Sequence, residues 1–227
     1  MIQKLIKRVV LLLFSLFSAN AMFSQQADTV HKTKFEPAFD FDQRFNYMQN
    51  RWANVWGYRE GVIIKGKYKV GIGEYYMNEN VTELPIPKDI NPNYPVSQNQ
   101  QLYYGTVYFE PFLFRHEYLE ASLVFEAGYG RTVNTFKDAD DGVVYDNYNR
   151  YFVPVGAGVS INLKFPALFG WHALRWFGIN ICGGYRSSIA QGDPVHNYNG
   201  AYWSISTAIF LDRMFEDIFL KKHKSTD

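Results

Sequence analysis

The stretch from Arg150 to Phe165 constrains the fold of this chain more than any other part of the sequence. Its even positions are mostly small or polar, whereas its odd positions are all apolar: Tyr151, Val153, Val155, Ala157, Val159, Ile161, Leu163 and Phe165. Successive side chains of a β-strand leave opposite faces, so a period of two predicts a strand. This alternation outlasts the roughly 5–6 residues of an ordinary soluble strand. A long strand with one continuous apolar face is typical of a transmembrane β-barrel.

Seven further segments complete a set of eight expected strands. Mostly apolar residues occupy the odd positions of three of them, 119–131, 177–184 and 201–211. The other four expected strands are 39–47, 52–64, 68–76 and 102–114. In the last of these we expect Thr106 and Glu110 to face inward, because a carboxylate facing lipid would be costly.

The connections between these segments alternate in length. Short links are expected near 65–66, 115–117 and 166–174, and long ones at 78–100, 133–149 and 189–199. Outer-membrane barrels combine tight periplasmic turns with longer outer loops in this way. The sequence therefore predicts an all-β fold, a transmembrane antiparallel up-and-down β-barrel of eight strands over residues 38–211, with both termini on the periplasmic side.

The N-terminus has the features of a secretory signal. Lys4, Lys7 and Arg8 precede an apolar run at 9–17, and the small residues of Ala19-Asn20-Ala21 follow it. The apolar run is shorter than the roughly 20 residues that a membrane-spanning helix needs. We therefore expect a signal peptide at 1–21, cleaved after Ala21. A periplasmic linker at 22–37 and a periplasmic C-terminal tail at 212–227 would flank the barrel.

Composition narrows the class of protein further. The single cysteine, Cys182, excludes an intramolecular disulfide and lies far from the signal, so a lipoprotein is not expected. Removing the three basic residues of the signal leaves 20 basic against 22 acidic residues, a net charge of −2 that argues against nucleic-acid binding. No segment after the signal holds 18 consecutive apolar residues, so a membrane-spanning form of this chain would have to be a closed barrel. The aromatic content of 18% suits the two membrane interfaces.

These features, with the glycine–aromatic pieces Gly71-Ile72-Gly73-Glu74-Tyr75 and Ala127-Gly128-Tyr129-Gly130, resemble the small eight-stranded outer-membrane β-barrel proteins of Gram-negative bacteria. The resemblance implies a monomer in the cell outer membrane. Its surroundings would be outer-membrane lipids and lipopolysaccharide, and the barrel-assembly machinery would insert it. Such barrels commonly finish at a C-terminal aromatic residue, whereas this chain continues past Leu211. The continuation is expected to be a short amphipathic helix or an extension of the last strand.

The alternation also predicts which charges enter the barrel. The inward set is Lys67, Lys69, Glu120, Glu126, Arg150, Lys164 and Arg186. An eight-stranded barrel is just wide enough for its side chains to fill it. We therefore expect these charges to pair across the interior, and a functional pore is the alternative.

Candidate binding residues lie in the expected outer loops. Closely spaced prolines stiffen the segment 85–95, and loops on rigid scaffolds are common binding sites. The candidate residues are Pro87, Asp89, Tyr94, Asp140, Asp193 and His196. The sequence does not identify their extracellular ligand.

Catalysis, cofactors and metals have little support in the sequence. The five histidines, His31, His116, His172, His196 and His223, do not have the spacing of metal ligands. The acidic segment 138–142 lacks the frame and the bidentate Glu of an EF-hand. We therefore expect no enzyme activity, no cofactor and no bound metal.

Three functional interpretations follow. The first is an integral outer-membrane barrel with a structural, adhesive or ligand-binding role through its outer loops. The second is a narrow solute channel. The third is an exported soluble lipocalin-like carrier, whose apolar face would surround an apolar ligand. The glycine-rich composition of the other face favours the membrane, since a water-facing surface would hold more Lys and Glu.

Overall fold

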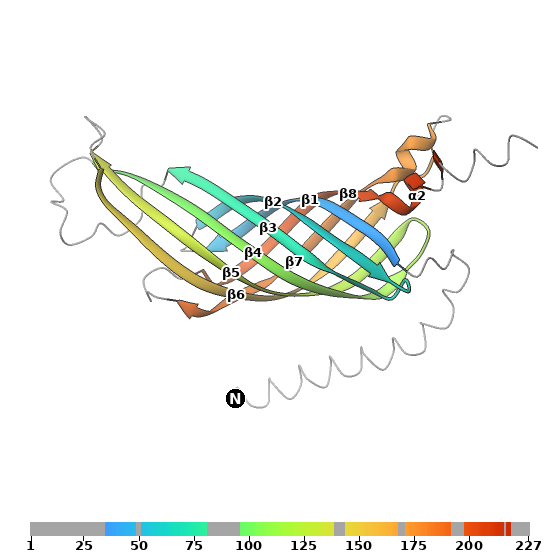
Figure 1. The fold of residues 1–227 in the computed structure, drawn as a ribbon, viewed down its shortest axis with the longest axis horizontal. Coiled ribbons are helices and arrows are strands. Elements are labelled where there is room, and N and C mark those ends of the chain that lie inside the picture. The colour runs from blue at the N-terminus through green and yellow to red at the C-terminus, as the bar shows by residue number, and fades with distance from the viewer. Residues whose placement is uncertain are drawn as a thin grey trace, which may run out of the picture.

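The computed structural model describes residues 35–48, 51–80, 96–138, 144–167, 171–191, 198–215 and 217–218. In this part of the chain, eight antiparallel strands form one closed barrel (Figure 1). The strands are β1 (Phe35–Met48), β2 (Arg51–Ile64), β3 (Tyr68–Asn80), β4 (Val96–Arg115), β5 (Leu119–Asp138), β6 (Val144–Lys164), β7 (Phe177–Gln191) and β8 (Gly200–Phe210). A 3-10 helix, η1 (His172–Trp176), precedes β7, and a short helix, α2 (Leu211–Phe215), follows β8.

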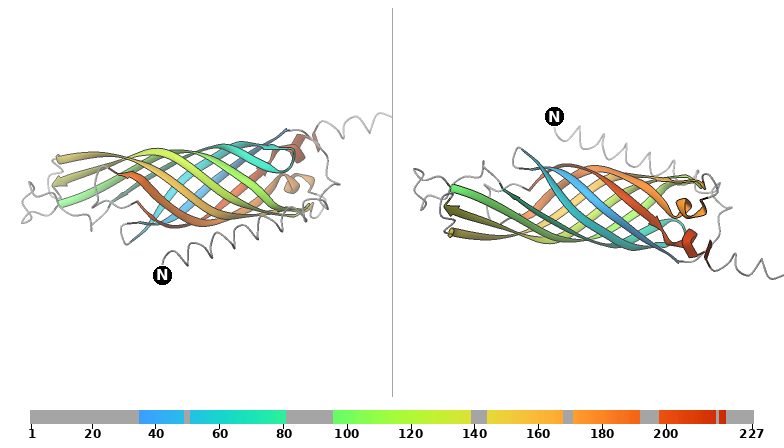
Figure 2. Two further views of the ribbon diagram at one scale, coloured as in Figure 1. Left: turned by 90° about the horizontal axis from the view of Figure 1, so that it is seen from below. Right: turned by 90° about the horizontal axis from the view of Figure 1, so that it is seen from above.

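Each strand pairs with its neighbours in sequence, and β1 pairs with β8 to close the ring. The register of that closure runs from Ala38 opposite Phe210 to Asn46 opposite Tyr202. The strands cross the barrel obliquely (Figure 2). The expected all-β, up-and-down, eight-stranded architecture is therefore confirmed, and so is the first strand, which begins at Phe35 rather than at residue 39.

One end of the barrel, here called the tight-turn end, carries the turns at 65–67 and 116–118. The first of these turns places Lys65 and Gly66 in the left-handed region, with φ values of 50° and 66°. A glycine adopts that conformation without steric cost. Helices η1 and α2 also lie at this end (Figure 1), so the tail begins with a helix rather than with an extension of β8.

The opposite end, here called the loop end, is where the chain leaves the strands at 81–95, 139–143 and 192–197. One connection there departs from the expected alternation of lengths, since β1 ends at Met48 and β2 begins at Arg51. Among the described residues no helix combines the length and the apolar character needed to cross a membrane.

Strands β4, β5 and β6 project past their neighbours at the loop end (Figure 2). Pairing of β3 with β4 stops at Asn80 and Asn99, and pairing of β6 with β7 stops at Phe152 and Gln191. Residues 96–98, 133–138 and 144–151 continue beyond these points as a three-stranded extension. The expectation of a loop at 133–149 was wrong, because backbone pairing continues where the apolar alternation has ended.

Candidate functional site

The outer surface of the barrel is an apolar belt. Its large side chains are substantially exposed on every strand, among them Phe41, Trp56, Ile72, Val107, Phe125, Tyr151, Ile181 and Ile205. Trp52, Trp56 and Trp203 lie toward the loop end of their strands, whereas Trp171 directly precedes η1 at the tight-turn end. Aromatic side chains at two levels flank the apolar band of transmembrane barrels. Such a surface is suited to lipid rather than to water.

The interior is polar, and its centre is built around Arg44 of β1. This guanidinium donates to Asp42 at 2.7 Å and to both carboxylate oxygens of Glu126 on β5, at 2.8 and 3.1 Å. Arg186 of β7 reaches the same Glu126 at 2.9 Å. The Asp42 carboxylate also accepts hydrogen bonds from hydroxyls of two other strands, Tyr75 and Ser206. Five strands therefore converge on two carboxylates.

A second group of charges surrounds Arg59 of β2. Its guanidinium donates to Glu110 of β4 at 2.6 Å and to Asp40 of β1 at 3.2 Å. Lys69 of β3 donates to the same Asp40 oxygen at 2.5 Å. Arg59 also lies 3.7 Å from Asp42, so the two groups form one network.

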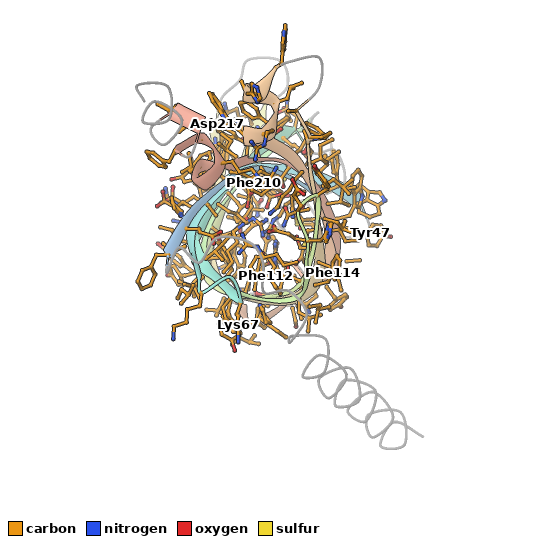
Figure 3. All side chains as sticks on the ribbon, turned by 90° about the vertical axis from the view of Figure 1, so that its right-hand side faces the viewer. Tyr47, Lys67, Phe112, Phe114, Phe210 and Asp217 are labelled. Atoms are coloured by element: carbon orange, nitrogen blue, oxygen red, sulfur yellow. The ribbon has the colours of Figure 1, made fainter. Side chains whose placement is uncertain are left out.

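A third group closes the interior toward the tight-turn end. Arg115 of β4 bridges Glu36 of β1 and Glu120 of β5, each at 2.6 Å. Lys164 of β6 reaches the same Glu120 oxygen at 2.6 Å and lies over the ring of Phe210. Figure 3 looks along the barrel from this end and shows nitrogen and oxygen atoms crowded inside the ring of strands.

The three groups balance in charge. Among the described residues, the three groups, together called the network, contain six acidic and six basic side chains: Glu36, Asp40, Asp42, Glu110, Glu120 and Glu126 with Arg44, Arg59, Lys69, Arg115, Lys164 and Arg186. All are buried except Arg115, which is part-buried. Buried ions need close partners to offset their desolvation, and each of these has one.

Toward the loop end the interior side chains are mainly apolar rather than charged. An apolar cluster, here called the plug, fills the barrel there with Met48, Ala53, Val55, Tyr75, Met77, Leu102, Tyr104, Phe152 and Tyr198. The cavity beside it measures about 10 Å³ and is lined by both Phe152 and Arg186, which is space for about one water molecule. The described interior is therefore packed at both levels rather than hollow.

The structure places five of the seven expected interior charges in the network: Lys69, Glu120, Glu126, Lys164 and Arg186. Arg150 lies half-buried on β6, in the three-stranded extension.

Lys67 is a correction to the expected set. It belongs to the β2–β3 turn and is exposed outside the ring of strands (Figure 3). The alternation of β3 begins only at Tyr68, so the inward parity does not extend to Lys67.

Sequence reasoning missed four central members of the network. Asp40, Asp42 and Arg44 occupy the polar face of the expected first strand, and that alternation was the signal that could have identified them. Arg59 gave no such signal, because the inward face of β2 also holds apolar Ala53 and Val55.

The candidate loop residues Pro87, Asp89, Tyr94, Asp140, Asp193 and His196 lie outside the described residues, as do the signal peptide and its cleavage site. In the part of the chain that the structure describes, no three His, Cys, Asp or Glu side chains gather as a metal site would require.

Neither a scan against protein-family models nor a search of curated proteins gives a match. Similar solved structures do exist. A major outer membrane protein from Thermus thermophilus is 10% identical, with a TM-score of 0.52, over 77% of this chain and 98% of that one. The N-terminal β-barrel domain of Pseudomonas aeruginosa OprF is 8% identical, with a TM-score of 0.44, over 79% and 98%. Ail, the attachment invasion locus protein of Yersinia pestis, is 12% identical, with a TM-score of 0.43, over 77% and 96%.

At such low identity the likeness to the Thermus protein concerns the fold alone. The geometry agrees with it, since an apolar exterior surrounds a polar, paired interior. A lipocalin-like carrier has the opposite arrangement, with its apolar side inward. The chain therefore has the fold of an eight-stranded transmembrane β-barrel of the outer-membrane type.

Proposed function

We propose that this protein is an integral outer-membrane β-barrel that is closed to solutes and acts as a rigid scaffold. Its role is structural, adhesive or ligand-binding, exercised through the outer connections and the three-stranded extension, without catalysis. The tight-turn end faces the periplasm, and the loop end faces the outside of the cell.

The packed interior carries this proposal. A continuous water path would have to pass both the charge network and the plug. Yet Arg44, Glu126 and Leu102 are each at most 5% exposed. The narrow-channel alternative would require these groups to move apart. Separation would leave buried ions without partners, and that costs several kcal/mol.

The three-stranded extension supports a display role. Its strands rise beyond the apolar belt and pair with one another, so they carry one end of the connection 81–95 and both ends of the connection 139–143 on a rigid base. Binding residues are often found on loops that a rigid scaffold positions. The expected binding residues Asp89 and Asp140 belong to these two connections.

Closure to solutes can be tested with the purified full-length chain. We expect an unboiled sample to migrate faster than a boiled one on a denaturing gel, as a closed, detergent-resistant barrel would. Reconstituted in planar bilayers, the same sample should show no steady conductance. A stable, voltage-independent channel from heat-modifiable protein would overturn the closed scaffold in favour of the channel. Recovery of the chain as a soluble periplasmic protein would overturn the membrane location.

Orientation can be tested with two exposed lysines at opposite ends. Lys137 lies in the extension and Lys67 in the tight turn. Each is changed to Cys, and buried Cys182 is changed to Ser in both variants. A membrane-impermeant maleimide added to intact cells should label K137C and leave K67C unlabelled until the outer membrane is permeabilised. Labelling of K67C alone in intact cells would reverse the orientation.

A further inference from the structure

The apolar belt is interrupted by a groove on the outer wall of β2 to β6. It has a volume of about 410 Å³, and most of its lining side chains are aromatic. The outward-facing lining residues are Trp56, Tyr58, Glu74, Tyr76, Tyr103, Gly105, Tyr129, Arg131 and Tyr151. Gly57, Tyr75, Tyr104 and Gly130, which occupy inward-facing positions, complete the lining. Because most of the lining faces outward, the groove opens on the exterior of the barrel.

The strand register explains why a groove forms here. One row across the wall reads Trp56, Tyr76, Tyr103, Arg131, Tyr151, each residue opposite the next. The adjacent row reads Tyr58, Glu74, Gly105, Tyr129. Gly105 is the one position in these rows without a side chain. A Cβ added there would meet its nearest atom, a backbone oxygen, at 3.9 Å, so the space above Gly105 is open.

Aromatic rings wall this open space. Tyr76 and Tyr103 lie with ring centroids 4.6 Å apart, and Tyr129 stacks on Tyr151 at 5.7 Å. Tyrosine and tryptophan concentrate where membrane headgroups meet hydrocarbon. The first row lies in the loop-end half of its strands, and the second row lies at mid-strand. The tyrosines of both rows indicate a level where headgroups meet hydrocarbon.

Two opposite charges stand on this wall. Arg131 lies over the ring of Tyr103 at 5.9 Å, and Glu74 accepts a hydrogen bond from Tyr58. Neither Arg131 nor Glu74 forms an ion pair within the described part of the chain. A charge on the lipid-facing side of a barrel is destabilising when nothing neutralises it.

The spacing of the two charges defines what could neutralise both. Strand spacing and rise put their Cα atoms about 12 Å apart, on either side of Gly105. Side chains of their length then leave room for a small dipolar group between them. Its anionic part would meet the Arg131 guanidinium. Its cationic part would meet the Glu74 carboxylate and the faces of the tyrosine rings, which attract cations.

We propose that this groove binds a membrane lipid whose headgroup carries both a phosphate and an amine, as phosphoethanolamine does. Arg131 holds the phosphate, Glu74 and the surrounding rings hold the ammonium, and the acyl chains continue along the apolar belt. The proposal rests on the proposed membrane location of the barrel. An acyl chain alone would explain the rings but would leave both charges without an opposite charge.

The test is native mass spectrometry of the delipidated full-length barrel, titrated with defined lipids in detergent. We expect phosphatidylethanolamine to bind about tenfold more tightly than phosphatidylglycerol, which lacks the amine, since a charge-assisted hydrogen bond contributes on that scale. Glu74→Gln should abolish the preference for phosphatidylethanolamine, and Arg131→Gln should weaken the binding of both lipids. A heat-modifiability gel of the same samples reports separately whether the barrel is folded, so a failure of the proposed function is distinguishable from a failure of this proposal.

Gly105→Leu fills the groove and should remove tight lipid binding. Its matched control is Gly183→Leu, another outward-facing glycine where an added Cβ also meets its nearest atom at 3.9 Å. That control lies on β7, away from the groove, and should bind as the unchanged barrel does. Equal binding of the two lipids by the unchanged barrel, or equal losses in both leucine variants, would overturn the proposal.

Discussion

The charged network and the plug fill two different levels of the barrel interior, and they do so with different kinds of side chain. From its centre to the tight-turn end, the interior holds twelve charged side chains in specific pairs, such as Arg44 with Glu126. Toward the loop end it holds the plug, where side chains such as Leu102 and Phe152 pack by shape. A paired charge depends on the identity of its partner, whereas a packed side chain depends mainly on volume. The two levels should therefore respond differently to conservative substitutions.

The largest effect is expected from Arg44→Met, which keeps much of the side-chain bulk and removes the charge. Asp42 would lose its closest cation, and Glu126 would retain only Arg186. Breaking a buried pair in this way costs about 3–5 kcal/mol. The measurement is the free energy of unfolding in urea, followed by tryptophan fluorescence in lipid vesicles. The double variant Asp42→Asn/Arg44→Met should be less destabilised than the sum of its two single variants. Strict additivity would show that the pair is not coupled.

In the plug, Leu102→Ala should lower the free energy of unfolding by about 3 kcal/mol. The Leu102 side chain is only 2% exposed, so its truncation leaves a buried cavity. Leu102→Met conserves volume and should cost less than about 1.5 kcal/mol. The same urea titration measures both variants. A methionine variant as unstable as the alanine variant would show that this level also depends on residue identity.

A charge-conserving change in the network gives the direct contrast with the methionine variant. Arg59→Lys keeps the positive charge but loses the planar fork that reaches Glu110, Asp40 and Asn180 together. One buried acceptor would then lack a donor, at a cost of about 2 kcal/mol. Unfolding free energies of R59K and L102M, compared in one experiment, should place R59K as the less stable. The reverse order would contradict the distinction between the two levels.

The smallest effect is expected for the ion pair of Arg51 and Glu79, near the loop end. Their side chains are 18% and 29% exposed and lie 2.8 Å apart. Part-exposed pairs are screened by water and salt, so Arg51→Ala should cost less than about 1 kcal/mol. High salt should reduce that cost further. A loss of unfolding free energy as large as that of Arg44→Met would show that burial does not determine how much an ion pair contributes to stability.

The sequence predicted the strands wherever one face is apolar and the other is not. β5 to β8 were identified by alternation alone, and Glu126 and Lys164 followed as inward charges. The three-stranded extension was missed because it rises above the apolar belt, where no face needs to be apolar. Lys67 was assigned inward because parity was carried one residue too far into a turn.

The sequence could not predict which charged side chains of the network contact each other. Arg44 and Glu126 are 82 residues apart, and their contact depends on the tilt and the register of every strand between them. Arg59 was missed for a related reason, since the inward face of β2 mixes one charge with small apolar residues. Periodicity identifies a face, whereas a partner across the interior requires the closed barrel.

The pairing of β1 with β8 has a consequence for the order in which the protein can acquire its structure. Asp42 accepts a hydrogen bond from Ser206, which lies 164 residues further along the chain. Contacts between such distant residues form late, because a long segment must first be brought into place. The carboxylates of β1 therefore lack part of their final environment until the last strand arrives. A chain truncated before β8 would present buried-type charges and two unpaired edges, and we expect quality-control proteases to degrade it.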